Sequence, residues 1–152
     1  MCWYAVFVWL SSIICCKLLQ KTMEAGEKIL KAQETRVQLF HELKDAIQAF
    51  QNQKIGLEQM GIITQLVTEG FNEASRDIRD AQQQTNQEIK NLVDELQSLE
   101  KQRLMDTVKL YQIQQLENQE RDYSSERESL RQSLDNLSRK IDETIQSIKD
   151  EL

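Results

Sequence analysis

Few side chains in this sequence have the types and spacing that catalytic or metal chemistry requires. His41 is the only histidine, and the three cysteines, Cys2, Cys15 and Cys16, all lie in the apolar opening of the chain. No second histidine, glycine-rich loop or serine in a tight turn accompanies them, so a nucleophile with its base, a metal cluster and a phosphate cradle are all missing. The sequence therefore predicts a protein that is not an enzyme and that takes no cofactor or metal.

The carboxylates are numerous, but they are spread along the chain among basic residues and glutamine. The chain has 25 Asp and Glu against 19 Lys and Arg, a formal net charge of −6. An acidic balance disfavours binding to the phosphates of a nucleic acid. Lys101, Arg103 and the later basic residues alternate with acidic ones at helical spacing, which is typical of a solvated face. We therefore expect these charges in solvent and no direct contact with nucleic acid.

The composition indicates which elements position these residues. Among the 152 residues there is no proline, glycine numbers 4, and charged residues make up 29%. Straight-chain residues, which lose little rotamer freedom on a helix, dominate after the opening. The predicted fold class is all-α: an elongated helical bundle or coiled coil of three to four helices, with an apolar N-terminal segment. The expected domains are an apolar extension (1–22), a helical domain (23–121) and an amphipathic coiled-coil helix (122–152).

Apolar residues recur every three or four positions, the pattern of amphipathic helices. The stripes run from Leu30 to Phe50, from Met60 to Ala81, from Ile89 to Leu116 and from Leu130 to Leu152. Each stripe predicts a helix face that needs to be buried, with Phe40, Val67 and Phe71 holding the first two helices together.

Turns and helix starts separate these stripes. Gly56 and Gly61 predict a turn between the first two helices. A serine or threonine followed three residues later by glutamate favours a helix start, and this pattern begins at Thr85 and at Ser125. Near Ser125 the chain either turns or continues as one long helix. In the third stripe the phase slips by five residues, to Leu104.

The last four residues, Lys149, Asp150, Glu151 and Leu152, spell the address by which soluble proteins are retrieved to the endoplasmic reticulum. They also have a structural explanation. Leu152 is the next step of the last apolar stripe, and the three residues before it occupy the exposed positions between steps. The address reading requires that the chain enter the lumen.

The opening gives little support for entry. Residues 1–16 are uncharged and the first basic residue, Lys17, follows them, which is the reverse of a standard signal peptide. The run is also short of the roughly 20 residues that cross a bilayer. Met23 begins a stretch that reads like the start of a soluble helical protein. Residues 1–22 are therefore a spurious or alternative extension, a signal or anchor with membrane contact through residues 1–19, or an apolar helix packed on the remainder.

Three stretches resemble one protein family: KAQETRVQLFHEL, QLVTEGFNEASRDI and LVDELQSLEKQRLMDTVKLYQIQ. They are similar to the required-for-excision B-domain proteins over roughly residues 30 to 116, and the closing SRKIDETIQSIKDEL looks like the last helix of that family. The resemblance implies a role in DNA excision repair and supplies no catalytic residue. The residues that carry it are Gln33, Glu34, Arg36, Val37, Val67, Thr68, Phe71, Ser75, Leu96, Gln97, Glu100, Leu104 and Thr107.

Three hypotheses follow. In the first, the chain is a nuclear or cytoplasmic non-enzymatic adaptor that acts in excision repair through contacts of its apolar stripes with a protein partner or a second copy. In the alternative, it is a lumenal or membrane-associated coiled-coil protein retained in the endoplasmic reticulum by residues 149–152. In the third, it is a generic self-associating structural coiled coil.

Overall fold

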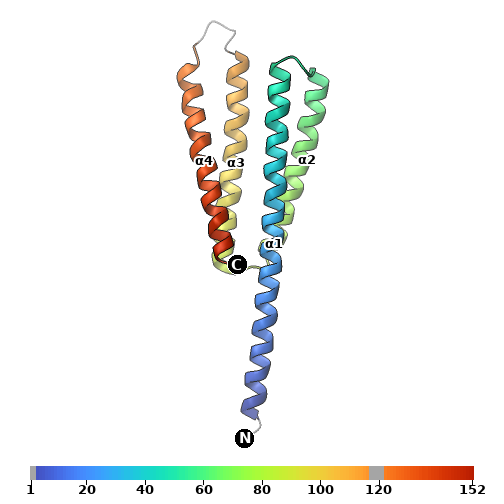
Figure 1. The fold of residues 1–152 in the computed structure, drawn as a ribbon, viewed down its shortest axis with the longest axis vertical. Helices are drawn as coiled ribbons and strands as arrows, with labels where there is room; N and C mark the ends of the chain where they lie inside the picture. Colours follow the sequence, from blue (N-terminus) through green and yellow to red (C-terminus); the bar gives the residue numbers. More distant parts are fainter. Residues whose placement is uncertain (1–2, 117–121) are drawn as a thin grey trace.

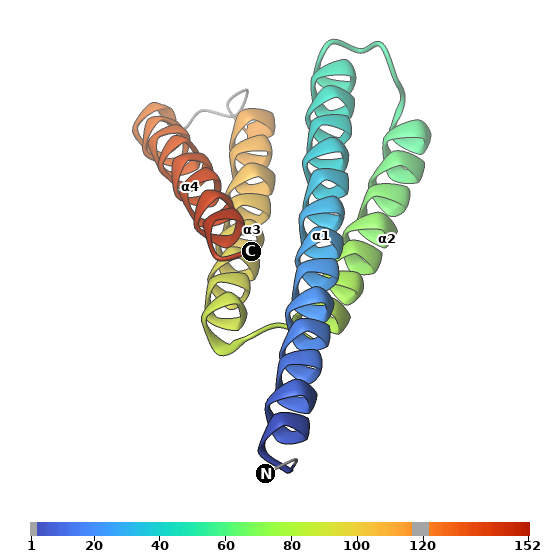
Figure 2. The ribbon, with the colours of Figure 1, turned by 60° about the horizontal axis from the view of Figure 1, so that its bottom comes forward.

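Two antiparallel helical hairpins stand side by side, α1 with α2 and α3 with α4 (Figures 1 and 2). The structure, a computed structural model, describes residues 3–116 and 122–152, and of residues 3–16, 18, 115 and 116 only the backbone. The all-α bundle predicted from composition is confirmed, and the last two stripes form two separate helices. The helices are α1 (Trp3–Gln51), α2 (Leu57–Gln82), α3 (Gln87–Leu116) and α4 (Ser124–Asp150).

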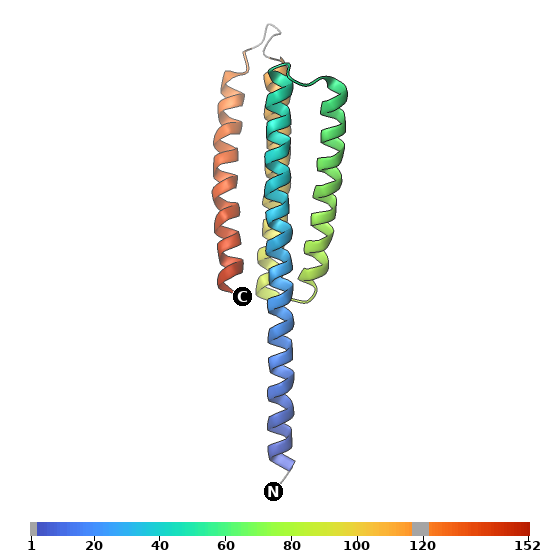
Figure 3. The same cartoon turned by 45° about the vertical axis from the view of Figure 1, so that its right-hand side comes forward.

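The first helix is much longer than its partners. It has 49 residues and continues without a break past residue 22, so its N-terminal part projects beyond the end of the bundle (Figures 1 and 3). The side chains of residues 1–16 lie outside the described set, and the interpretations offered for that segment stay predictions. Among the residues whose side chains are described, no helix has an apolar stretch long enough to cross a membrane.

The turn predicted from two glycines lies just before the first of them, and the second takes no part in it. The first hairpin turns before α2, and Gly56 stands just ahead of that helix with an extended backbone. Gly61 lies inside α2, at a position where an added β-carbon would meet nothing within 4 Å. The chain reverses over residues 52–55, where Gln53 has a left-handed backbone (φ 57°) and Lys54 N donates a hydrogen bond to Ala49 O at 2.8 Å.

Both predicted helix starts are wrong by one or two residues. Asn86 caps α3, because its Oδ1 accepts a hydrogen bond from the backbone N–H of Ile89 at 2.8 Å. The Thr85 hydroxyl instead donates to the carbonyl of Gln82 at the end of α2. At α4 the carboxylate of Asp122 accepts the backbone N–H of Ser124 at 2.9 Å, and Ser125 is already inside the helix. A short polar side chain can satisfy these free amides whether or not a glutamate follows it.

Two apolar clusters form the core. The first gathers side chains from all four helices near the end where α2 connects to α3, and the second joins α1 to α2 nearer the opposite end. The fully buried residues of the first cluster include Ile29, Ile78, Ile89, Val93, Leu96, Ile141 and Ile148, and those of the second are Leu43, Ala46, Met60 and Val67.

The buried face of α1 is rotated from the stripe that begins at Leu30. Ile29, Arg36 and Ala46 are buried, whereas Leu30 and Phe50 are only half-buried. The difference arises because α1 is covered on two sides, by α2 and by the second hairpin, so the strip between the two apolar edges is the most buried. That strip contains polar residues, which an apolar periodicity cannot reveal.

Candidate functional site

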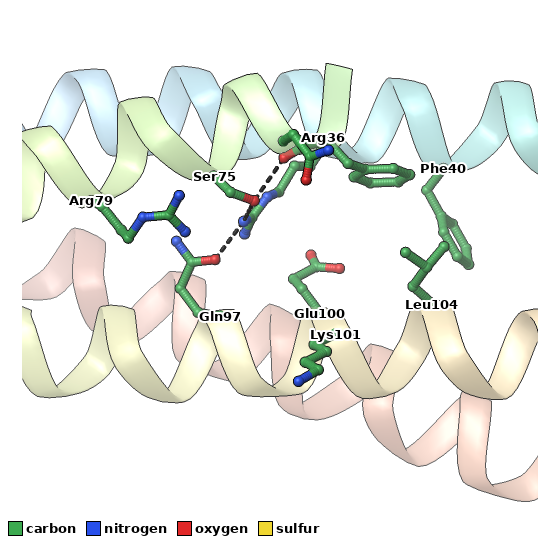
Figure 4. A pocket seen from close by; sticks show the side chains of 10 residues that line it. Arg36, Phe40, Ser75, Arg79, Gln97, Glu100, Lys101 and Leu104 are labelled. Carbon is green, nitrogen blue, oxygen red and sulfur yellow. Dashed lines mark hydrogen bonds between the residues drawn. The ribbon is translucent and has the colours of Figure 1, made fainter. Parts of the chain in front are cut away.

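Polar side chains join the two hairpins at mid-height, where α1 faces α3. The amide of Gln33 donates a hydrogen bond to the carboxylate of Glu100. The guanidinium of Arg36 donates to the hydroxyl of Ser75 on α2 at 2.6 Å and to the amide oxygen of Gln97 on α3 (Figure 4). Three helices are therefore tied together through Arg36. We call this arrangement of Gln33, Arg36, Ser75, Gln97, Glu100 and Arg103 the polar seam.

Glu100 and Arg103 form an ion pair within α3. Their side chains lie 2.7 Å apart and are less than a tenth exposed. The Arg103 guanidinium also stacks over the ring of Phe40 on α1, with 4.1 Å from its central carbon to the ring centroid. A cation over an aromatic face is attracted electrostatically. Phe40, half-buried, thus contacts α3, and it is not among the residues of the second apolar cluster, which joins α1 to α2.

The electrostatics of the seam are dominated by buried positive charge. Burial lowers the pKa of the Arg36 guanidinium from its ordinary value; Glu100 opposes this shift, and the neighbouring Arg79 and Arg103 reinforce it. Arginine stays protonated at neutral pH even so. The lowered pKa therefore means that the bundle stabilises the Arg36 cation less well than water does, in spite of Glu100.

A groove of about 380 Å³ opens between α2 and α3 (Figure 4). Residues of the polar seam line it, and α1 forms its floor. Its walls combine charged and amide groups with aromatic and aliphatic ones. We call it the seam groove. The residues that matter for its chemistry are Arg36 and Phe40 of α1, Phe71, Ser75 and Arg79 of α2, and Gln97, Glu100 and Leu104 of α3.

Several buried donors in the seam lack an acceptor. Arg36 is 4% exposed, and its second terminal nitrogen has no hydrogen-bond partner among the described residues. The amide nitrogen of Gln97 is likewise unpartnered. Since Gln97 receives the Arg36 hydrogen bond on its oxygen, its nitrogen must point elsewhere. Unsatisfied buried polar groups are costly, and their presence together marks the groove as a candidate binding site.

Charged residues that the sequence places on a solvated face are partly internal. Glu100, Arg103 and Asp106 are each 8% exposed. Asp106 accepts a hydrogen bond from Ser133 of α4 at 2.7 Å. The expectation of solvation is wrong for these three residues because they stand on the inward face of α3. The phase slip before Leu104 falls in this stretch, and it is the one feature of the sequence that could have indicated polar residues at core positions there.

Six of the family-like residues meet in the seam groove, although they come from three helices: Arg36, Phe71, Ser75, Gln97, Glu100 and Leu104. Phe40, Asn72, Arg79 and Lys101 complete the groove, and the sequence did not single out any of them as a groove residue. Phe40 belongs to the predicted stripe of α1, whereas Asn72, Arg79 and Lys101 lie outside any apolar stripe, so periodicity gave no reason to place the four side chains together. A groove residue is recognised only when neighbouring helices are in place.

The other family-like residues support the bundle. Val67 and Leu96 are buried in the two apolar clusters, and Val37 is half-buried on α1 facing α4. Thr107 is buried and donates to the carbonyl of Arg103 at 2.8 Å, and exposed Thr68 donates to the preceding turn of its own helix.

The last four residues lie as the periodicity of the last apolar stripe predicts. Lys149, Asp150 and Glu151 are exposed, while Leu152 packs against the first apolar cluster. Its side chain lies so close to Gly26 that a β-carbon there would come within 2.0 Å of Leu152 Cδ2. Whether these residues also act as a retrieval address stays a prediction. Elsewhere in the described residues, no cluster of three or more His, Cys, Asp or Glu is arranged to hold a metal ion.

Comparison with known proteins adds two findings. The model of a family described as DNA repair REX1-B matches residues 24–115. The heterochromatin silencing protein rss1 of Schizosaccharomyces pombe is 49% identical over 129 residues, which cover 85% of this chain and 98% of that relative. These findings confirm the family resemblance read from the sequence, and the names of family and relative both concern DNA and its packaging.

Proposed function

Because the chain belongs to the DNA repair REX1-B family, we propose that it is a non-enzymatic helical adaptor that acts on DNA or chromatin processes in the nucleus by binding other proteins. The family description points to repair, and the name of the fission-yeast relative points to silencing of heterochromatin. A protein that brings other factors together serves either process without chemistry of its own.

One observation carries the adaptor proposal. Family-like residues that are far apart in the sequence converge on the seam groove, and the groups they present are guanidinium, amide, hydroxyl and apolar side chains. Such groups recognise a partner by hydrogen bonds, charge and burial. A groove of about 380 Å³ has room for a side chain from another protein.

The charge of the chain favours a protein partner over DNA itself. With a net charge of −6, the surface repels a polyanion, and each phosphate contact would have to overcome that repulsion. The basic groups of the groove are confined to one small region. We therefore assign the contact with DNA to the partner.

A replacement experiment tests the proposal. The relative's coding sequence in fission yeast is replaced by that of this chain, and silencing of a heterochromatic reporter and survival after ultraviolet irradiation are measured. We expect silencing to be restored, because 49% identity over nearly the whole relative preserves the fold. In parallel, the purified chain should not retard naked duplex DNA in a gel at low salt. Loss of silencing, or tight binding to naked DNA, would contradict the adaptor role.

A further inference from the structure

The seam groove presents donors that converge on one place and find no acceptor there. The guanidinium of Arg79 and the amide of Gln97 both point into the space between α2 and α3 (Figure 4). Arg79 makes no hydrogen bond or ion pair within the described residues, and the Gln97 amide nitrogen and one Arg36 nitrogen are unpartnered. An acceptor group in this space would satisfy all three side chains.

The missing acceptor should be negatively charged. The guanidinium groups of Arg36 and Arg79 line the groove against the single carboxylate of Glu100, which is already paired with Arg103. Lys101 also borders the groove, but its ammonium points away from it (Figure 4). Burial and the two nearby guanidinium groups together disfavour the Arg36 cation. An anion next to Arg36 and Arg79 would offset both effects, and hydrogen bonds from arginine to an anion are about twice as strong as neutral ones.

The rest of the groove limits what the anion is attached to. Phe40, Phe71 and Leu104 form an apolar wall beside the donors, and Phe71 and Leu104 also pack on the second core cluster. A ligand that fits both parts carries one carboxylate with apolar carbon next to it. A phosphate of a nucleic acid fits poorly, because the remaining surface is acidic and sugar and phosphate neighbours are polar.

We propose that the seam groove binds an aspartate or glutamate side chain of a partner protein, with an adjoining apolar side chain of the same segment packed on Phe40, Phe71 and Leu104. This inference rests on the adaptor function and names the chemistry by which it selects its partner. The carboxylate accepts hydrogen bonds from Arg36, Arg79 and Gln97, and so completes the polar seam.

The test uses a probe that contains only these two features. The full chain, labelled with nitrogen-15, is titrated with 3-phenylpropanoate and separately with the neutral 3-phenylpropanamide, and side-chain signals of Arg36 and Gln97 are followed by nuclear magnetic resonance. We expect the carboxylate to shift these signals and to bind at least about tenfold more tightly than the amide. Phenyl phosphate serves as the third probe and should bind no better than the carboxylate.

A matched pair of variants locates the site. Arg79→Gln removes one donor of the groove, whereas Arg76→Gln removes the same charge from an exposed position of α2 that does not line it. Arginine and glutamine have similar helix propensities, so both variants should fold normally. The preference for carboxylate over amide should disappear in Arg79→Gln and persist in Arg76→Gln.

Three results would overturn the proposal: equal binding of amide and carboxylate, equal behaviour of the two variants, or a clear preference for phenyl phosphate. The outcome of this binding experiment is independent of the outcome of the replacement experiment in fission yeast. If silencing is restored but the carboxylate does not bind, the adaptor function stands on another surface. If silencing is not restored although the carboxylate binds, the groove is a real site and the proposed function is at fault.

Discussion

The amide of Gln33 on α1 donates a hydrogen bond to the carboxylate of Glu100 on α3, and both residues are buried. Each of the two hairpins is held together internally by apolar contacts, but at this height they meet through polar groups. Glu100 is the shared partner, since it accepts the Gln33 hydrogen bond and pairs with Arg103. The stability of the bundle should therefore depend on this one carboxylate.

The first prediction concerns a variant that removes the charge of Glu100 and keeps the shape of its side chain. Glu100→Gln leaves the guanidinium groups of Arg36 and Arg103 buried without a counter-charge, and breaking a buried ion pair in this way costs about 3–5 kcal/mol. The free energy of unfolding is measured by urea titration followed by circular dichroism. Glu95→Gln, at an exposed position of the same helix, is the control and should change stability by less than about 0.5 kcal/mol. Equal costs would show that Glu100 is solvated after all.

The second prediction compares a fully buried core residue with a groove residue. Ile78 is 0% exposed in the first cluster, so Ile78→Ala should cost about 2–5 kcal/mol. Phe71 is half-buried at the groove, and Phe71→Ala should fall short of the roughly 3–5 kcal/mol lost by a fully buried phenylalanine. Melting temperatures of the two variants provide the comparison. If Phe71→Ala is the more damaging change, Phe71 is a core residue and not a wall of the groove.

The third prediction uses two glycines of α2. At Gly61 a β-carbon would meet nothing within 4 Å, so Gly61→Ala should gain about 0.8–1.0 kcal/mol of helix propensity. At Gly70 the same β-carbon would lie 2.8 Å from a methyl group of Leu39, and α1 approaches α2 closely there. Gly70→Ala should therefore gain clearly less than Gly61→Ala or become destabilising. Urea midpoints that move equally in both variants would show that Leu39 moves aside without cost.

The fourth prediction concerns pH and the start of α4. The backbone N–H of Ser124 holds the pKa of the exposed Asp122 carboxyl below its ordinary value of 3.8. A lowered pKa in the folded state means that the hydrogen bond from Ser124 to Asp122, which precedes the N-cap residue Tyr123, stabilises the start of the helix above about pH 4. This contribution is lost as the pH falls through the lowered value. The protection of the amides in the first turn of α4 against hydrogen exchange, taken relative to the intrinsic exchange rate at each pH, should fall over that acidic range. In Asp122→Ala the exchange should already be fast at neutral pH and show no such step.

Periodicity predicted most of the fold, because burial of an apolar stripe is a local property of the sequence. The last stripe illustrates this: Leu130, Ile141 and Ile148 are all buried as expected. The apolar stripe predicted for α1 does not coincide with the face that is buried, because Arg36 lies at the centre of the buried face. An arginine is assigned to solvent unless the helices that cover it are known.

The candidate site could be predicted only in part. The family resemblance supplied Arg36, Ser75 and Gln97 as residues that matter, but not that they touch each other across three helices. Arg79 gave no signal in the sequence, since it looks like any exposed cation on a helix. Its importance comes from facing the unpartnered amide of Gln97, which is a property of the packing between α2 and α3.

The polar seam also determines how the two hairpins are aligned along their length. Apolar side chains accept many neighbours, so a hairpin interface made of them alone could slide by one helical turn at little cost. If α3 slid by one turn, Glu100 would leave Gln33, and Gln97 would leave Arg36, so that charged and amide groups would be buried without partners. The register of the bundle is therefore fixed by a few polar contacts, and the hydrophobic clusters supply the cohesion.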